Sequence, residues 1–308
     1  MLRSNTIRLI GFPMDLGANR RGVDMGPSAL RIADIDIHIE ELGYKVVDGG
    51  DIEVKMQETQ EIEDPQLKYL PEIVLSCTKL ATVVKETLDK GEFPLILGGD
   101  HSMSIGSIAG ISAHCQEHNK RLGVLWIDAH ADLNTPDTTP SGNIHGMPLA
   151  TCIGIGEESL TNIFDFAPKI QNDRLVIIGL RSVDPGEKTL IKEKGIKAYS
   201  MLEIDRQSIA KVIEETIIYF KAKKIDHLHI SFDLDSVDPS IAIGVGTPVL
   251  GGLSYREVHL IMETIAEQME VSSFEIAEVN PILDNKNSSA VLAVNIAASL
   301  FGKRILDV

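Results

Sequence analysis

The sequence contains no long hydrophobic run. Its most apolar stretch, Val291 to Phe301, is interrupted by Asn295 and Ser299, whereas a membrane-spanning helix needs about 20 mainly apolar residues. The first apolar run, Thr6 to Phe12, is split by Arg8 and does not resemble a secretory signal. We therefore expect neither a membrane span nor secretion.

Cysteine is also scarce, and basic residues are outnumbered. The 308 residues include three cysteines, Cys77, Cys115 and Cys152, whose spacing fits neither a disulfide framework nor a zinc ribbon. The 29 Lys and Arg residues stand against 45 Asp and Glu residues, which gives a net charge of −16. A field of that sign repels phosphate backbones, so nucleic acid is not an expected partner. These features favour a cytoplasmic globular protein with reduced thiols.

Apolar runs typical of strands alternate with helical patterns along the chain. The expected strands are Thr6–Phe12, Lys45–Val47, Phe93–Leu97, Leu122–Ile127, Leu175–Ile178, Ile196–Tyr199, His227–Phe232 and Val271–Ile276. The expected helices begin near Pro27 and cover Leu67–Lys90, Ser102–His118, Gly186–Lys194, Ser208–Lys221, Ser254–Glu270 and Ser288–Phe301, and a surface loop is expected over Asp51–Asp64. Strands separated by helices pair in parallel through right-handed crossovers. With no repeat or linker, we predict a single α/β domain over residues 1–308, with helices on both faces of a parallel sheet.

Three polar clusters follow directly on predicted strands. They are GGDHS from Gly98, DAHAD from Asp128 and DLD from Asp233. In parallel α/β sheets, ligands bind just beyond the carboxyl ends of the strands. The two glycines of the first cluster are only a weak signal for a phosphate cradle, because no lysine follows them. Each cluster alone also fits a solvated turn, but three clusters at three strand ends favour a binding site.

The spacing of these polar residues predicts a metal site. In extended backbone, side chains at i, i+2 and i+4 project to the same side, so Asp128, His130 and Asp132 are expected to converge, as are Asp233 and Asp235. Carboxylates gathered in a desolvated cleft require cations. The candidate ligands are four carboxylates and two imidazoles with no thiol: His101, Asp128, His130, Asp132, Asp233 and Asp235. This set suits divalent ions such as Mn²⁺, and its size fits two ions that share carboxylates.

Six segments of the chain resemble the ureohydrolase family, which includes arginase, agmatinase and formimidoylglutamase. In the family's order they are GGDHSMSIGS from Gly98, DAHADLNTPDTTPSGNIHGMP from Asp128, GLRSVDPGE from Gly179, SFDLDSVDPS from Ser231, GVGTPVLGGLSYRE from Gly244 and EVNPILD from Glu278. The resemblance is strongest to the arginase branch. It implies a three-layer α/β/α domain with an eight-stranded parallel sheet and two Mn²⁺ ions. It also implies that Asp128 and Asp233 bridge the ions, with His101 and Asp132 on one ion and His130 and Asp235 on the other.

The activity that this resemblance implies is hydrolysis of the guanidinium group of L-arginine to L-ornithine and urea, by a hydroxide that bridges the two manganese ions. His145 matches the family's proton-shuttle position, and histidine suits that task because its pKa lies near neutrality. Glu278 matches the carboxylate that pairs with the guanidinium, whose planar fork fits a carboxylate in two-point contact.

Substrate recognition is assigned by the same resemblance. Asn134, Ser141 and Asn143 match the positions that bind the α-carboxylate, and Asp184 matches the position that receives the α-amino group. Glu187 and Thr247 match positions that support the substrate site. Many arginases carry an acid where this chain has Ser182, so the α-amino contact is expected to use Asp184 alone or water. An uncharged donor set for a carboxylate favours arginine over agmatine.

Other interpretations stay open at this point. The substrate could be agmatine, guanidinobutyrate or formimidoylglutamate, the working ion could be Co²⁺ or Ni²⁺, and the fold could serve non-catalytic metal binding. His145 and Glu278 argue against the last alternative, because metal storage needs neither. The resemblance further implies a homohexamer, with a homotrimer as the alternative and a subunit contact near Tyr255-Arg256-Glu257.

Overall fold

The computed structural model describes residues 4–306. The strands of this part of the chain form one eight-stranded sheet. All neighbouring strands are parallel, in the order β2-β1-β3-β8-β7-β4-β5-β6. The strands are β1 Thr6–Phe12, β2 Lys45–Asp51, β3 Phe93–Gly98, β4 Leu122–Ile127, β5 Leu175–Leu180, β6 Lys197–Ser200, β7 His227–Asp233 and β8 Val271–Ala277. The predicted α/β class and the implied eight-stranded parallel sheet are confirmed.

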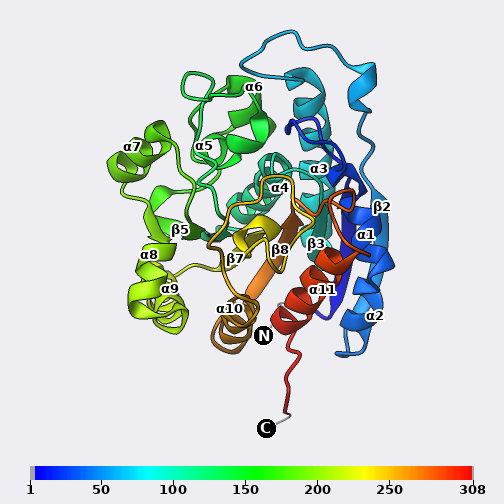
Figure 1. Cartoon of the computed structure of the whole chain (residues 1–308), viewed down its shortest axis with the longest axis vertical. Helices are drawn as coiled ribbons and strands as arrows, with labels where there is room; N and C mark the ends of the chain where they lie inside the picture. The colour runs from blue at the N-terminus through cyan, green and yellow to red at the C-terminus, as the bar shows by residue number, and fades with distance from the viewer. Residues whose placement is uncertain (1–3, 307–308) are drawn as a thin grey trace.

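Helices cover both faces of this sheet (Figure 1). They are α1 Gly26–Ile32, α2 Ile35–Glu40, α3 Leu70–Asp89, α4 Met103–Glu117, α5 Pro148–Cys152, α6 Glu158–Thr161, α7 Pro185–Lys194, α8 Met201–Gln207, α9 Ile209–Lys223, α10 Tyr255–Gln268 and α11 Ser288–Leu300. Helices α3 to α7 pack on one face, whereas α1, α2 and α8 to α11 pack on the other. This arrangement gives the three layers.

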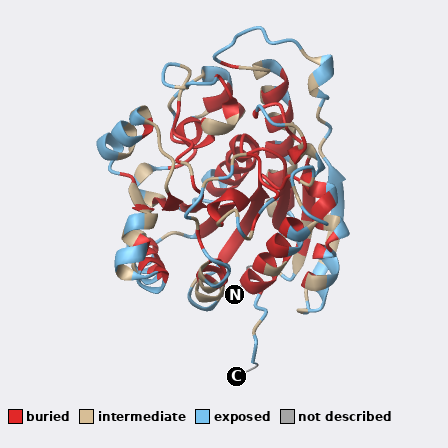
Figure 2. Cartoon of the chain, viewed as in Figure 1, coloured by how far each residue is buried: buried red, intermediate tan, exposed pale blue. Residues whose placement is uncertain are grey.

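Side chains alternate between the two faces along each central strand. In β4, Leu125 and Ile127 belong to the hydrophobic cluster on the α9 to α11 side, whereas Val124 and Trp126 belong to the cluster on the α3 and α4 side. The central strands are accordingly buried, and exposure is concentrated on outer helices and loops (Figure 2). The continuous apolar runs of the sequence reflect this burial on both faces.

The structure differs from the predicted elements in a few places. Strand β2 continues to Asp51, and the expected loop after it contains a three-residue 3-10 turn, Gln57–Thr59. The short helices α2, α5, α6 and α8 were not expected. Helix α8 nevertheless has a sequence signal, because Ser200 and Glu203 form a capping box at its start.

The strand order explains where the polar clusters meet. Strands β3, β8, β7 and β4 are consecutive neighbours in the middle of the sheet, and being parallel they end at the same edge. His101 follows β3, Glu278 follows β8, Asp233 ends β7 and Asp128 follows β4. The fold therefore delivers four separate segments to one place. Among the described residues, no helix is long and apolar enough to cross a membrane.

Candidate active site

A cavity of about 300 Å³ lies at this edge of the sheet. Every predicted site residue except Asp128 lines it, namely His101, His130, Asp132, Asn134, Ser141, Asn143, His145, Asp184, Glu187, Asp233, Asp235, Thr247 and Glu278, and Ser182 lines it as well. Asp128 lies beneath the cavity and has no exposed surface. The structure thus brings the whole predicted set together.

One potential metal-binding group is centred on His101. Its Nδ1 lies 2.9 Å from Asp233 Oδ2, 3.1 Å from Asp128 Oδ2 and 3.2 Å from Asp132 Oδ2. An imidazole nitrogen carries at most one proton and so cannot satisfy three carboxylates. A cation among these four side chains would satisfy them all, and the residues present therefore fit a metal ion.

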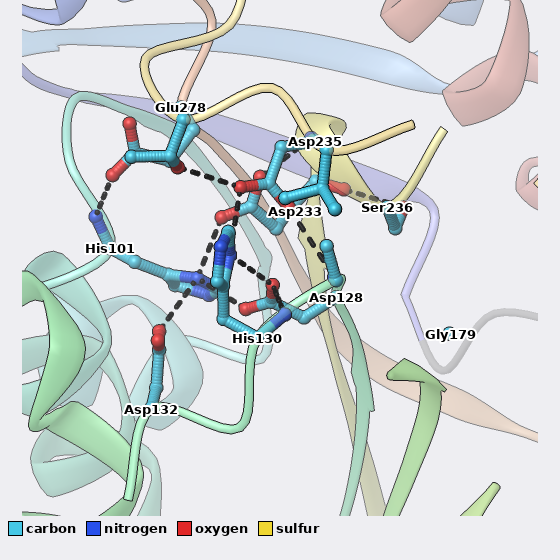
Figure 3. A network of polar contacts seen from close by, with 12 residues as sticks. His101, Asp128, His130, Asp132, Gly179, Asp233, Asp235, Ser236 and Glu278 are labelled. Carbon is cyan, nitrogen blue, oxygen red and sulfur yellow. Dashed lines mark hydrogen bonds and ion pairs between the residues drawn. The ribbon is translucent and has the colours of Figure 1, made fainter. Parts of the chain in front are cut away.

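A second group lies on the other side of Asp128 (Figure 3). His130 Nδ1 is 3.1 Å from Asp235 Oδ2 and 3.5 Å from Asp128 Oδ1. Asp128 directs its other oxygen, Oδ2, at His101, so its two oxygens serve different groups. Of the two bridging carboxylates implied by the family, Asp128 belongs to both groups, whereas Asp233 belongs to the group of His101 alone.

The residue spacing predicts convergence through extended backbone, and this explanation is wrong. Asp132 has φ of 51°, in the left-handed region, and Asp235 lies in a 3-10 turn, Leu234–Ser236. The loop after β4 bends so that the backbone N–H of His130 donates to Asp128 Oδ1 at 2.7 Å. Bent loops at neighbouring strand ends, rather than a two-residue periodicity, bring the side chains together.

Several residues that support the site were not predicted. Trp126 donates from Nε1 to Asp128 Oδ2 at 2.9 Å and stacks on the His101 ring with centroids 4.1 Å apart. Ser231 Oγ lies 2.9 Å from His101 Nε2. Arg181 donates to the backbone carbonyls of Asp235 and Ser236 at 2.6 and 3.0 Å, which holds the loop after β7. Such partners orient metal ligands. The contacts of Ser231 and Arg181 join segments that are far apart in the sequence, so they leave no local sequence signal.

The electrostatics of the cluster match a site built for cations. Burial and the charges of Asp235 and Asp128 raise the pKa of Asp233 well above its ordinary value. Burial, followed by the charge of Asp128, raises the pKa of Asp132 to about 6. Burial lowers the pKa of His101, but its three carboxylate partners outweigh this and leave the pKa well above its usual value. The three carboxylates thus favour the protonated, cationic form of the neighbouring His101.

Glu278 connects the candidate metal ligand His101 to His145. Its Oε1 accepts the backbone N–H of His101 at 3.1 Å and lies 3.1 Å from His145 Nδ1. Burial lowers the pKa of His145, but the hydrogen bond and charge of Glu278 outweigh it and raise the pKa to about 9. Glu278 has φ of 64°, a conformation that costs a glutamate roughly 1–3 kcal/mol and is typical of functional sites.

The outer part of the cavity holds the predicted substrate contacts. Asn134 Nδ2 donates to Asp184 Oδ2 at 2.9 Å. The residue predicted to bind the α-carboxylate is therefore hydrogen-bonded to the residue predicted to bind the α-amino group. Glu187 accepts the backbone N–H groups of Leu133 and Asp184 at 2.9 and 2.7 Å and caps α7. Its contacts position the loop that carries Asn134. Burial raises the pKa of Glu187 to about 7.

Two further predicted residues also have structural partners. Thr247 Oγ1 donates to Asp235 Oδ2 at 2.9 Å, which places Thr247 behind a candidate metal ligand. Ser141 Oγ accepts the backbone N–H of Asn143 at 3.2 Å.

The two glycines before Asp100 reflect close packing, because a Cβ on Gly99 would lie 2.0 Å from the carbonyl oxygen of Met14.

Comparisons with known proteins agree with this geometry. Residues 5–302 match the model of the Arginase family. The arginase of Bacillus subtilis (strain 168) is 52% identical over 301 residues, which cover 98% of this chain and 99% of that protein. The native structure of Bacillus caldovelox arginase has a TM-score of 0.93 at 51% identity, covering 97% and 99% of the two chains. The Entamoeba histolytica arginase in complex with L-ornithine has a TM-score of 0.89 at 31% identity, covering 98% and 100%. This chain therefore belongs to the arginase family.

Proposed function

We propose that this protein hydrolyses the guanidinium group of L-arginine to L-ornithine and urea. The observation that carries the proposal is the arrangement of Asp128, whose two oxygens face two different imidazole–carboxylate groups in a cavity that also contains His145 and Glu278. A guanidinium is a poor electrophile because its charge is delocalised. Its hydrolysis needs an activated water, a carboxylate to hold the cation and a proton donor, and this cavity contains residues suited to each task.

The residues that would hold two metal ions are His101, Asp128, His130, Asp132, Asp233 and Asp235. When bound, divalent cations here supply the Lewis-acid chemistry that makes water nucleophilic near neutral pH. We propose manganese as the metal, because carboxylate oxygens with two imidazoles and no thiolate suit Mn²⁺. Trp126, Ser231 and Thr247 hold the ligands in place through the contacts described above.

Glu278 is proposed to hold the guanidinium. Its Oε2 is buried and has no hydrogen-bond partner among the described residues, so it is free to accept a substrate N–H. Oε1 is held by the N–H of His101 and by His145, which fixes the plane of the carboxylate. A carboxylate fixed in this way orients the planar guanidinium carbon for attack.

His145 is proposed to donate the proton that the reaction requires. Addition of water to the guanidinium carbon is followed by cleavage of its bond to the chain nitrogen of arginine, and the departing ornithine amine must gain a proton. His145 lines the cavity next to Glu278 and, with its pKa raised to about 9, is cationic at neutral pH. The side chain can therefore supply that proton directly.

The outer residues are proposed to select an amino acid over an amine. Asn134, Ser141 and Asn143 offer uncharged donors for an α-carboxylate, and Asp184 offers a carboxylate for an α-ammonium. Ser182 lines the cavity beside Asp184 but supplies no charge. Agmatine lacks the carboxylate and cannot use the first group of contacts.

Assembly and cellular location stay predictions. We propose a homohexamer in preference to a homotrimer, cytoplasmic, with residues 1–308 as one domain. Arg256, in the expected contact region, pairs with Glu263 at 3.3 Å and has 58% of its side chain exposed. Light scattering coupled to size-exclusion chromatography distinguishes six subunits from three.

The proposed function is tested by product release from a substrate panel. The purified protein, loaded with Mn²⁺, is assayed with L-arginine, agmatine, guanidinobutyrate and formimidoylglutamate. We expect kcat/KM for L-arginine to exceed that for each other compound by at least tenfold. Equal or better turnover of agmatine would contradict the arginine assignment.

A further inference from the structure

The cavity is lined by six carboxylates and three histidines, but by no lysine or arginine. Asp132, Asp184, Glu187, Asp233, Asp235 and Glu278 all line it, and none of the lining residues in the described part of the chain is lysine or arginine. Bound cations would offset the inner carboxylates. The outer end still has to accept the α-carboxylate of an amino acid beside Asp184 and Glu187, which is unfavourable without a positive charge nearby.

Lys68 lies behind this outer end. Its Nζ is 3.0 Å from Asn143 Oδ1 and 3.1 Å from Asn19 Oδ1. Within residues 4–306, no carboxylate oxygen lies close enough to Lys68 to form an ion pair. Lys68 itself does not line the cavity, whereas Asn143 does and is buried. The ammonium group of Lys68 therefore acts on the cavity through its hydrogen bond to Asn143.

The position of Lys68 is fixed by its backbone as well as by its side chain. The backbone N–H of Lys68 donates to the carbonyl of Gly142 at 3.1 Å. Gly142 has φ of 72°, and a Cβ there would lie 1.8 Å from the carbonyl oxygen of Pro65. Only glycine allows the segment before α3 to approach the loop of Ser141 to His145 so closely. Lys68 is thus held against the predicted substrate loop.

The hydrogen bond to Lys68 determines how the Asn143 amide is oriented. An ammonium only donates, so the atom that faces Lys68 must be the amide oxygen. The amide nitrogen of the same planar group then points away from Lys68 and remains a donor. The charge-assisted hydrogen bond also polarises the amide, which strengthens its N–H as a donor.

From these contacts we infer that Lys68 is a positioning residue for substrate specificity: it holds Asn143 with its N–H directed to the α-carboxylate and adds positive charge at that end of the cavity. The inference rests on the proposed function and identifies a residue outside the predicted set. Neutral Asn134 and Ser141 cannot provide that charge. Selection for α-amino acids over amines then depends on a lysine that does not contact the substrate.

The test compares Lys68→Met with Lys68→Arg in the manganese-loaded enzyme. We expect Lys68→Met to raise KM for L-arginine about tenfold and to leave kcat within about twofold, because a charged hydrogen bond is lost far from the reacting carbon. Lys68→Arg retains the charge and should recover most of the loss. The inhibition constant of L-ornithine should rise with KM, whereas that of agmatine, which lacks a carboxylate, should not change.

A double-mutant cycle tests whether the effect passes through Asn143. In an Asn143→Ala background, Lys68→Met should raise KM less than about threefold, since the amide that Lys68 orients is gone. The inference is overturned if kcat falls as much as KM rises, if agmatine inhibition weakens by the same factor, or if KM does not change. A wild-type protein that releases no urea from L-arginine would instead contradict the proposed function, and with it the basis of this inference.

Discussion

His145 Nδ1 lies 3.1 Å from Glu278 Oε1, and the same carboxylate oxygen accepts the backbone N–H of His101. One glutamate thereby connects the proposed proton donor, the proposed guanidinium site and a proposed metal ligand. Its other oxygen, Oε2, has no hydrogen-bond partner within residues 4–306 and is the atom proposed to accept the substrate. Replacing His145 should therefore impair protonation of the leaving amine, whereas replacing Glu278 should mainly weaken substrate binding.

The pH dependence of the reaction should report His145. Because Glu278 raises the pKa of His145 to about 9, the imidazole is cationic below that pH and neutral above it. We expect kcat/KM for L-arginine to decline as the pH rises through about 9, as the proton donor is lost. The measurement is a pH profile of kcat/KM at constant ionic strength and saturating Mn²⁺.

His145→Asn should lower kcat by about 10² or more, the size usual for loss of a general acid, and should remove the decline near pH 9. The metal content should equal that of the wild type, because His145 is not among the proposed ligands. Unchanged activity in this variant would refute the proton-donor role.

Glu278→Gln should mainly weaken substrate binding. The substitution keeps the size of the side chain but replaces a carboxylate with a neutral amide, so the charged contact to the guanidinium is lost. We expect kcat/KM for L-arginine to fall about 100-fold. Thermal unfolding verifies that the variant is folded, and an activity within twofold of wild type would contradict the assignment.

The shared position of Asp128 predicts how metal content responds to substitution. Asp128→Asn should remove both ions, because Asp128 belongs to both groups. His130→Asn should leave about one ion per subunit, since the group of His101, Asp128 and Asp233 stays intact. Elemental analysis of dialysed protein measures this, with His38→Asn in α2, outside both groups, as the matched control. Equal losses in the two ligand variants would show that the groups do not share Asp128 as described.

Trp126 offers a probe of the same site. It is the only tryptophan in the chain, and it contacts both Asp128 and His101. We expect its fluorescence to change when the metal is removed by a chelator. Trp126→Phe loses the hydrogen bond to Asp128 and should weaken metal binding about 10- to 100-fold. An unchanged metal affinity would show that the hydrogen bond from Trp126 does not support the site.

Ser182 tests the recognition of the α-amino group. Ser182→Asp adds a carboxylate to the cavity beside Asp184 and should lower KM for L-arginine about two- to fivefold, the range of a partly exposed ion pair. Ser182→Asn is the matched control, because asparagine has the shape of aspartate without its charge. If both variants change KM alike, charge at this position does not contribute to recognition.

Much of the site could be predicted from sequence, although the two-residue spacing does not explain how its residues converge. The polar clusters follow buried apolar strands, and this pattern alone indicates the ligand side chains. The spacing predicts convergence through extended backbone, yet Asp132 is in a left-handed conformation and Asp235 lies in a 3-10 turn. What brings them together is the order of β3, β8, β7 and β4 in the sheet, and strand order has no local sequence signal.

The sequence pattern does not identify residues that act through tertiary contacts. Lys68 precedes a helix and resembles any other surface lysine in sequence, and within residues 4–306 the hydrogen bonds of Arg181 all go to backbone carbonyls. Asn134 was assigned to the substrate, but its amide also holds Asp184. Such roles depend on which loops pack together, as the segment of Lys68 does on Gly142, and only the folded chain reveals them.

The most direct test of the proposed chemistry measures metal stoichiometry and urea release on the same sample. Protein stripped by a chelator should hold no metal and release no urea from L-arginine, and titration with Mn²⁺ should restore activity until two ions are bound per subunit. Full activity in stripped protein, or saturation with a single ion per subunit, would contradict the two-ion site on which the proposed function depends.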